Sequence, residues 1–353
     1  MIQKNLIIFP PYYEALASDH PGLTLGRIVL QEKGLYHIIT MKGGLPASQP
    51  AEVSGKFRFE SSGPSDFPAV GDYVMVDTNN GDTAIIHRVL HRRSLFLRRA
   101  AGTANTEQAV AANIDTVFIC MALNNDFNLR RLERYLSAAW ESGSIPVVLL
   151  TKSDLCDDLD LKLAQVQGSA IGVDILTTSA LRNELDSLLS YMAPGKTVAF
   201  LGSSGAGKST LINRLLGEER LKTGGLRNDD RGRHTTTHRE LIILPDGAMV
   251  IDTPGMRELG MWDASEGIDT AFADIEELAE ACRFRDCTHS GEPGCAVCQA
   301  IAEGTLSQSR WQSYLKLTAE NSYAQDSESY LAAKEKKFKD IAKYNNANTR
   351  KRK

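Results

Sequence analysis

The sequence predicts a multidomain chain with a β-barrel at residues 1–100, an α/β domain at 101–262 and a helical domain at 263–353. Three observations predict this division. Short β-branched runs of alternating polarity fill the first part, apolar strands alternate with helices in the second, and helical patterns flank a cluster of Cys and His in the third. A chain of 353 residues is long enough for two or three domains, each with its own core.

The first part contains four runs with the alternation of half-buried strands. They are "TLGRIVLQEKG", "YHIITMK", "AEVSGKFRFE" and "DYVMVDTNNGDTAIIHRVL". Within the last run, "NNGD" at 79–82 predicts a hairpin turn, which brings the total to about five strands. So many short strands in so short a segment favour a small closed barrel of the OB-fold type, and an SH3-like barrel remains open.

Buried strands and helices alternate through the second part. We expect strands at 115–123, 145–154, 173–180 and 196–202, with helices at 128–143, near 157–167, at 183–192 and from 208 to 216. Such alternation is typical of a mostly parallel sheet with helices on both faces.

A glycine-rich loop stands between the strand at 196–202 and the helix that follows it. The segment "GSSGAGKST" fits the phosphate-binding pattern G-x-x-x-x-G-K-[ST], whose backbone N–H groups and helix N-terminus bind nucleotide phosphates. We expect Lys208 to bridge the β- and γ-phosphates and the Ser209 hydroxyl to bind Mg²⁺. The predicted phosphate-binding residues are Gly202, Ser203, Ser204, Gly205, Ala206, Gly207, Lys208, Ser209 and Thr210.

Two segments after this loop have the character of nucleotide switches. In "VIDTPG" at 250–255, a buried strand delivers Asp252 to the second shell of the metal, and Gly255 offers a backbone N–H to the γ-phosphate. The polar segment "GRHTTTHREL" at 232–241 offers a Thr hydroxyl to Mg²⁺. Thr236 is the predicted ligand, and Thr235 and Thr237 remain open. A D-x-x-G motif after a phosphate loop is typical of GTPases.

The base-recognition motifs precede the phosphate loop. "TKSD" at 151–154 and "TSA" at 178–180 each follow a predicted strand, and no such motif follows residue 255. Asp154 would accept guanine N1–H and N2–H₂, Lys152 would lie over the base or ribose, and the Ala180 N–H would reach guanine O6. Thr151 and Ser179 complete the predicted guanine-binding set. Because every site lies at strand carboxyl ends, a parallel sheet tolerates this rotated order, and we interpret the domain as a circularly permuted P-loop GTPase.

Cys and His follow a metal-ligand spacing in the third part. The segment "CRFRDCTHSGEPGC" gives Cys282-x4-Cys287-x-His289-x5-Cys295, which suits one tetrahedral Zn²⁺ with no open position, hence a structural site. Cys298 offers a competing Cys-x2-Cys arrangement with Cys295.

The order of the motifs resembles the RsgA (YjeQ/YloQ) family of small-ribosomal-subunit-dependent GTPases. The resemblance rests on "GSSGAGKS", "GRHTTT", "DTPG", the barrel and the Cys/His spacing, and extends from about residue 22 to 310. It implies GTP hydrolysis to GDP and phosphate, stimulated by the small subunit during its late assembly, and a zinc pattern that ends at Cys295. The chain departs from the family at Thr151, where Asn is commoner. We therefore expect somewhat weaker guanine binding.

Hydrolysis requires an oriented water and charge stabilisation rather than covalent chemistry. Met256 stands where many GTPases carry the water-positioning Gln, so we expect slow intrinsic turnover that rises when the partner completes the site. His234 is the predicted water-orienting residue, and with Lys208 and Thr236 it makes the predicted catalytic set.

Charge and hydropathy limit the classes of binding partner that the chain can have. Two basic clusters suit contacts with ribosomal RNA. One is "HRVLHRRSLFLRR" at 87–99, and the other is the segment 334–353, which holds nine basic and two acidic residues. No apolar run approaches the roughly 18–20 residues of a membrane span. We expect a cytoplasmic monomer that contacts no membrane. A P-loop kinase or ATPase with an accessory zinc domain, a translational GTPase on assembled ribosomes and an RNA chaperone remain open.

Overall fold

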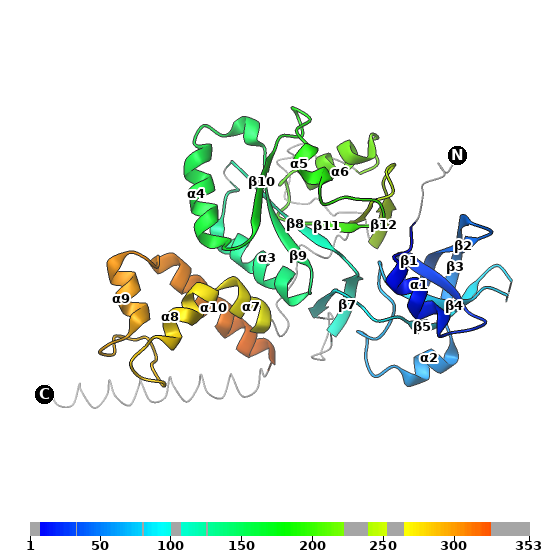
Figure 1. Ribbon diagram of the computed structural model, residues 1–353, viewed down its shortest axis with the longest axis horizontal. Coiled ribbons are helices and arrows are strands. Elements are labelled where there is room, and N and C mark those ends of the chain that lie inside the picture. Colours follow the sequence, from blue (N-terminus) through cyan, green and yellow to red (C-terminus); the bar gives the residue numbers. More distant parts are fainter. Residues whose placement is uncertain are drawn as a thin grey trace, which may run out of the picture. The chain divides into compact units, whose positions relative to one another are not determined.

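The computed structural model describes residues 8–32, 34–79, 81–99, 107–124, 126–221, 239–252 and 265–325. The chain forms two compact units, Met1–Gly260 and Met261–Lys353, which are described separately (Figure 1). Several predicted site residues lie outside the described ranges: His234, Thr235, Thr236, Thr237, Gly255 and Met256.

A closed five-stranded barrel begins the first unit. Its strands are β1 (Thr24–Glu32), β2 (Leu35–Lys42), β3 (Leu45–Val53), β4 (Tyr73–Asp77) and β5 (Ala84–Val89). They pair in the order β1-β2-β3-β5-β4, and β4 pairs again with β1 to close the barrel. Only the β3–β5 pair is parallel. The hairpin predicted at "NNGD" is confirmed, since β4 and β5 are antiparallel and Gly81 has φ +87°.

One barrel prediction is wrong. The segment "GKFRFE" is not a strand but the helix α2 (Gly55–Glu60), which begins after β3. Its N-cap is Ser54, whose hydroxyl accepts a hydrogen bond from the Phe57 N–H at 3.0 Å and satisfies an otherwise unpaired donor. A local cap therefore outweighs the alternating pattern. A further helix, α1 (Pro11–Ser18), packs on the barrel through buried Tyr13, whose ring stacks on Tyr73.

The α/β part is the rest of the main sheet. Its strands are β8 (Thr116–Ala122), β9 (Ile145–Thr151), β10 (Asp174–Thr178), β11 (Thr197–Leu201), β12 (Arg239–Ile243) and β13 (Met249–Asp252). They lie in the order β10-β9-β8-β11-β13-β12, and all neighbours are parallel except the antiparallel pair β12–β13. The predicted parallel sheet is confirmed, with the strand before the glycine loop at its centre.

Helices cover both faces of this sheet (Figure 1). They are α3 (Leu129–Glu141), α4 (Leu159–Ser169), α5 (Asp186–Leu189) and α6 (Lys208–Leu216). Phe118 and Phe200 stack with ring centroids 5.2 Å apart in the core beneath α5 and α6. The helix predicted at 183–192 is one turn only, because the Glu184 N–H and C=O are hydrogen-bonded to Ser179 and Thr178 and the backbone at Asn183 is left-handed.

The barrel and the α/β part share one continuous sheet. Strand β1 pairs antiparallel with β12, so the five barrel strands extend the α/β sheet at its edge. A separate hairpin of β6 (Leu95–Arg99) and β7 (Glu107–Ala112) lies between the two parts in the chain. The sequence predicted neither the shared sheet nor this hairpin.

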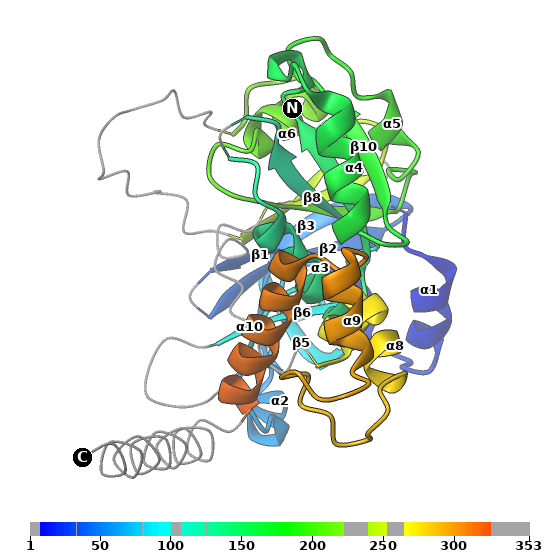
Figure 2. The same ribbon diagram turned by 90° about the vertical axis from the view of Figure 1, so that its left-hand side faces the viewer.

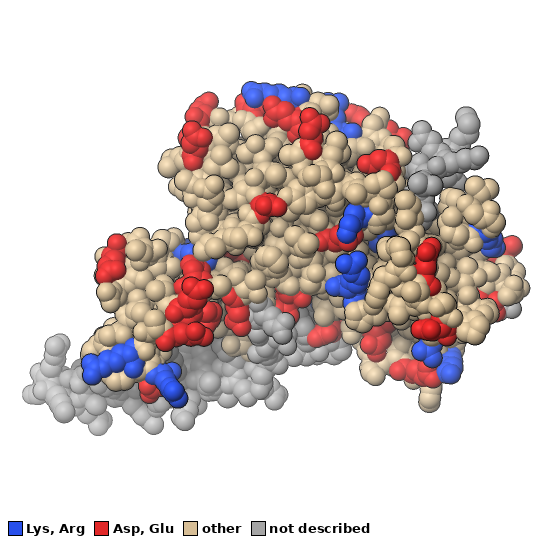
Figure 3. Space-filling model, in the orientation of Figure 1, with Lys and Arg blue, Asp and Glu red and all other residues tan. Residues whose placement is uncertain are grey.

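The second unit is helical, as predicted. Its helices are α7 (Ser265–Ala271), α8 (Ala273–Glu280), α9 (Ala296–Glu303) and α10 (Gln308–Gln325), and α8 lies beside α9 (Figure 2). Buried Arg310 holds α10 to α8 through Asp274, at 2.6 and 2.9 Å. Acidic side chains gather over α8 on the face drawn in Figure 3. Glu277 and Glu280 of α8 are exposed. Among the described residues, no helix is both long and apolar enough to cross a membrane.

Candidate nucleotide and metal sites

Four predicted segments end at one edge of the α/β sheet. The strands β9, β10, β11 and β13 carry the base motif, the "TSA" turn, the glycine loop and Asp252 at their carboxyl ends. Because these strands run parallel, their carboxyl ends lie at the same edge; Thr151, for example, pairs directly with Thr178. The rotated order along the chain is therefore compatible with one site in space.

The glycine loop has a backbone that only glycine permits at its entrance. Gly202 has φ +146°, and a Cβ there would lie 2.4 Å from the Cys120 carbonyl oxygen. Gly205 and Gly207 also have positive φ, and α6 begins at Lys208. The Lys208 ammonium donates to the Gly202 and Ser203 carbonyls, each at 2.6 Å, and so closes the loop over the helix N-terminus.

A threonine hydroxyl ties the base motif to the glycine loop. Thr151 Oγ1 donates to the Ala206 carbonyl at 2.7 Å, and both residues are buried. The end of β9 also packs against the loop. A Cβ atom built on Gly207 would lie 3.9 Å from the Thr151 side chain. Thr151 therefore joins two segments that lie about fifty residues apart in the sequence.

The two halves of the predicted base motif are also in contact. Buried Ser179 donates its hydroxyl to Asp154 Oδ1 at 2.5 Å and accepts the Arg182 N–H at 3.2 Å. Lys152 has a left-handed backbone with φ +58°, which turns the chain between β9 and Asp154. The carboxylate predicted to read guanine is thus held by the turn that carries Ala180.

One residue beside the glycine loop was missed by the sequence interpretation. The Asp126 carboxylate accepts a hydrogen bond from the Ser203 hydroxyl and forms an ion pair with Arg131 at 2.9 Å. Asp126 lies in the turn between β8 and α3, and Asn128 two residues later is the N-cap of α3. A cap residue directly after a buried strand was the available signal for an ordered turn at this edge.

The predicted Zn²⁺ ligands come together. One potential ligand atom from each of Cys282, Cys287, His289 and Cys295 lies within 4.8 Å of the others. His289 Nδ1 is 3.5 Å from both the Cys282 and Cys295 sulfurs, and those sulfurs are 3.9 Å apart. Tetrahedral Zn²⁺ with bonds near 2.3 Å places its sulfurs about 3.8 Å apart, so the set fits that ion.

The pKa values of two thiols in this cluster are shifted in opposite directions. A hydrogen bond involving the His289 backbone acts to lower the pKa of the Cys287 thiol, but burial and the neighbouring Cys295 and Cys282 thiols raise it to about 12. Burial acts to raise the pKa of the Cys295 thiol, but hydrogen bonds involving the Cys298 N–H and His289 lower it to about 6. A thiolate is the form that binds metal. Cys298 is not in the four-residue cluster, and its sulfur contacts the His289 carbonyl at 3.4 Å.

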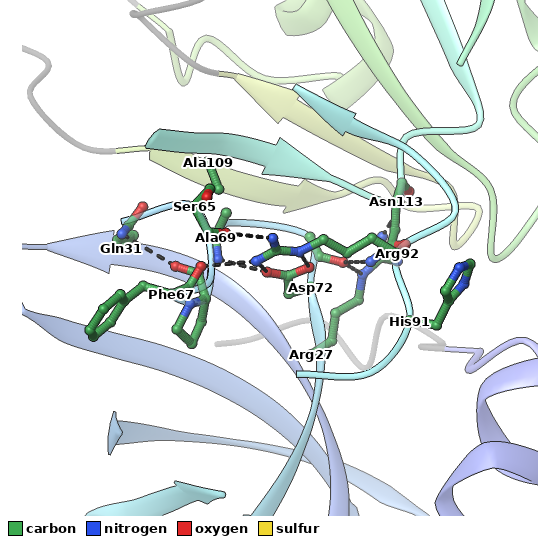
Figure 4. A network of polar contacts seen from close by, with 12 residues as sticks. Arg27, Gln31, Ser65, Phe67, Ala69, Asp72, His91, Arg92, Ala109 and Asn113 are labelled. Carbon is green, nitrogen blue, oxygen red and sulfur yellow. Dashed lines mark hydrogen bonds and ion pairs between the residues drawn. The ribbon is translucent and has the colours of Figure 1, made fainter. Parts of the chain in front are cut away.

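The basic cluster at 87–99 is divided between structural and exposed residues. Arg92 forms a two-bond ion pair with buried Asp72, at 2.8 and 2.9 Å, and also donates to the Ser65 and Phe67 carbonyls (Figure 4). Burial raises the pKa of the Asp72 carboxyl, and Arg92 opposes that shift. Arg92 is therefore occupied within the fold, whereas Arg88 and Arg93 are exposed.

Comparisons with known proteins agree with this geometry. The sequence model described as RsgA GTPase matches residues 89–262. A protein of Lactiplantibacillus plantarum named "Small ribosomal subunit biogenesis GTPase RsgA 2" is 50% identical over 88% of this chain and 87% of its own length. The RsgA of Opitutus terrae is 45% identical over 90% of this chain and 88% of its own length.

Two solved structures have a similar fold. YjeQ from Thermotoga maritima aligns with a TM-score of 0.62 and 25% identity, covering 84% of this chain and 97% of that one. YloQ, described as a circularly permuted GTPase, aligns with a TM-score of 0.59 and 26% identity, covering 85% of this chain and 95% of that one. The predicted β-barrel with a circularly permuted α/β domain is thereby supported.

Proposed function

The chain belongs to the RsgA family of small ribosomal subunit biogenesis GTPases, and from this premise we propose how its own residues bind GTP, hydrolyse it and engage the subunit. It is a GTP-hydrolysing enzyme of ribosome biogenesis. The observation that carries the residue assignments is the pair of contacts from Thr151 to Ala206 and from Ser179 to Asp154. The first contact joins the base motif to the phosphate loop, and the second joins the two halves of the base motif, although these segments occur in a rotated order along the chain.

Guanine is selected by Asp154. Its carboxylate accepts from N1–H and the exocyclic amine of guanine, a pair of donors that adenine does not present, while Ser179 holds it in place. Lys152 covers the base or ribose and the Ala180 N–H donates to O6. A site built on such bonds rejects adenine, because the wrong base leaves buried polar groups unpaired.

The phosphates are held by the N–H groups of the glycine loop and by Lys208. Residues 202–210 surround the α6 N-terminus, where backbone donors and the helix dipole favour negative charge. The hydroxyls of Ser209, at the start of α6, and of Thr236 would be the protein's ligands to Mg²⁺, which prefers oxygen donors. Asp252, at the end of β13, would stand in the second shell of that ion. Mg²⁺ supplies neutralisation of charge on the β- and γ-phosphates.

Hydrolysis then depends on ordering a water. We assign this role to His234, because Met256 offers no useful hydrogen bond where Gln is common. Single-turnover hydrolysis by His234→Ala with saturating small subunit tests the assignment. An unchanged rate with unchanged binding removes His234 from the mechanism.

The cluster in the second unit binds one structural Zn²⁺ through Cys282, Cys287, His289 and Cys295. Four protein ligands leave no position for a reacting water, so the ion holds the loop between α8 and α9. Support comes from the distances among the Cys282 and Cys295 sulfurs and His289 Nδ1.

The barrel is an OB-fold that contacts ribosomal RNA. The closed pairing order and the helix between β3 and β4 support the fold assignment. A groove of about 660 Å³ beside α2 is lined in part by Lys56, His87, Arg88 and His91, and also by the acidic residues Glu60 and Asp66. Phe59 of α2 is 91% exposed. Cationic and aromatic side chains together suit nucleic acid. The chain acts as a monomer in the cytoplasm.

Small-subunit dependence is the decisive test. GTP turnover is measured with no ribosomal particle, with purified small subunits, with large subunits and with assembled ribosomes, and Lys208→Ala serves as the inactive control. Co-sedimentation with GDP or a non-hydrolysable GTP analogue reports binding. We expect stimulation by small subunits alone. Stimulation only by assembled ribosomes would instead indicate a translational GTPase, and equal use of ATP would indicate a kinase or ATPase.

A further inference from the structure

Barrel strand β1 lies close to the predicted switch residue Asp252. Across the sheet, Glu240 of β12 pairs with Leu30 of β1 on one side and with Asp252 of β13 on the other. Two strand spacings, about 10 Å, therefore separate the barrel backbone from the end of β13. Only one strand stands between them.

Side chains reinforce the pairing of β1 with β12. Arg239, the first residue of β12, donates to Gln31 Oε1 of β1 at 3.3 Å and to the Ala109 carbonyl of β7 at 3.2 Å. Gln31 in turn donates to the Pro68 carbonyl at 3.4 Å, the bond marked by the dashed line from the labelled Gln31 in Figure 4. The start of β12 is thus bonded through Arg239 to both the barrel strand β1 and the hairpin strand β7.

Arg27, also on β1, reaches the two strands that carry catalytic segments. It is 2% exposed, and its guanidinium donates to Thr197 Oγ1 of β11 at 2.7 Å and to Met249 Sδ of β13 at 2.9 Å. It also donates to the Gly71 carbonyl at 3.3 Å and lies 4.6 Å from the centre of the Tyr73 ring. Thr197 and Met249 are the first residues of their strands, and each strand is five residues or fewer. A displacement of Arg27 would therefore act on the first residues of β11 and β13. These short strands lead to the phosphate loop and to Asp252.

We propose that Arg27 and the β1–β12 pairing are positioning elements through which contact of the barrel with the small ribosomal subunit stimulates GTP hydrolysis. This inference rests on the proposed function. Arg27 and Gln31 are outside the predicted nucleotide-binding set, and we assign them the role of setting where β13 and β11 present their carboxyl ends. The packed strands transmit displacement because a close-packed interior deforms little.

The test uses the full chain with small subunits and compares three variants. Arg27→Met removes the guanidinium donors but keeps an unbranched apolar stem, Arg27→Lys keeps the charge, and Gln31→Ala removes the Arg239 acceptor from a half-buried site. Gln49→Ala on β3, a barrel strand that does not pair with the α/β sheet, is the matched control. For each variant, GDP affinity, subunit affinity, intrinsic turnover and subunit-stimulated turnover are measured separately.

We expect Arg27→Met and Gln31→Ala to bind GDP and subunits as the unmodified chain does. The ratio of stimulated to intrinsic turnover should fall about 2- to 30-fold, with partial recovery in Arg27→Lys and no change in Gln49→Ala. Amide hydrogen exchange should rise in β12 and β13 of Gln31→Ala while β8 to β10 stay protected. A merely stabilising residue would not lower the ratio while both affinities hold.

The outcomes separate this inference from the proposed function. If small subunits do not stimulate the unmodified chain, the proposed function fails. If they stimulate it and the Arg27→Met and Gln31→Ala variants equally, with equal subunit occupancy, the coupling through β1 is wrong. Should Arg27→Met fail to fold, Gln31→Ala and its exchange pattern decide the question alone.

Discussion

The hydroxyl of Thr151 is predicted to be worth a measurable part of the nucleotide affinity. Thr151→Val keeps the branched shape and the strand preference of the side chain but removes the donor to the Ala206 carbonyl. Thr151 is 2% exposed and the hydrogen bond is 2.7 Å long, so the carbonyl would lose a buried partner. The substitution removes the hydrogen bond between β9 and the phosphate loop and leaves the contacts of Asp154 in place.

The expected loss of nucleotide affinity in Thr151→Val follows from the cost of leaving the Ala206 carbonyl without a hydrogen-bond donor. An unsatisfied buried acceptor costs about 1–3 kcal/mol. If nucleotide binding requires the ordered loop, that cost appears in the binding free energy and weakens GDP affinity about 5- to 150-fold. The preference for GTP over ATP should be retained, because the carboxylate that reads the base keeps its Ser179 partner.

Fluorescence titration with a labelled GDP measures the affinity, and thermal unfolding reports the folded state. The control is Thr116→Val, the same exchange at a residue 5% exposed at the opposite end of the sheet. An affinity within about twofold of the unmodified chain would refute the reasoning, given that a lost buried bond of 1.4 kcal/mol is tenfold. An equal loss in Thr116→Val would also refute it.

Three further outcomes are expected. Asp154→Ala should remove the preference for GTP over ATP while leaving phosphate-loop binding of inorganic triphosphate unchanged, as measured by competition titration. Cys282→Ser should reduce bound zinc from about one ion per chain to near zero by elemental analysis, and a chelator should lower the melting temperature of the unmodified chain but not of this variant. Arg92→Leu removes the ion-pair partner of buried Asp72 and should lower the free energy of unfolding, measured in urea, by about 3–5 kcal/mol. The control is Arg93→Leu at an exposed residue whose ion pair with Asp115 is 4.0 Å long, and it should lower that free energy by about 0–1 kcal/mol.

The sequence predicted those features that local chemistry determines. The helix from Lys208, the parallel strands and the hairpin at "NNGD" each depend on short-range signals, and the structure confirms them. The four Zn²⁺ ligands follow from spacing within fourteen residues, and they do converge. In each case the residues that decide the outcome are close along the chain.

Several features that depend on distant partners were not predicted. Nothing near Arg27 in the sequence indicates that Thr197 and Met249 will accept its hydrogen bonds, because those residues are brought to it only by the folded sheet. The pairing of β1 with β12 joins residues about two hundred positions apart. Asp126 was overlooked for the same reason, since its role appears only when Ser203 arrives beside it.

The permuted strand order decides where additional modules are attached. The α/β part begins with β8 and ends with β13, and these two strands lie on either side of β11. In an unpermuted order the chain would leave from β10 at the outer margin, far from the triphosphate. Here the preceding module enters beside the central strand at its amino end, and β13 ends at Asp252 at the edge of the sheet where the ligand would be held. The permutation thus joins the preceding module to a strand beside the one that carries the phosphate loop, instead of to a strand at the outer margin of the sheet.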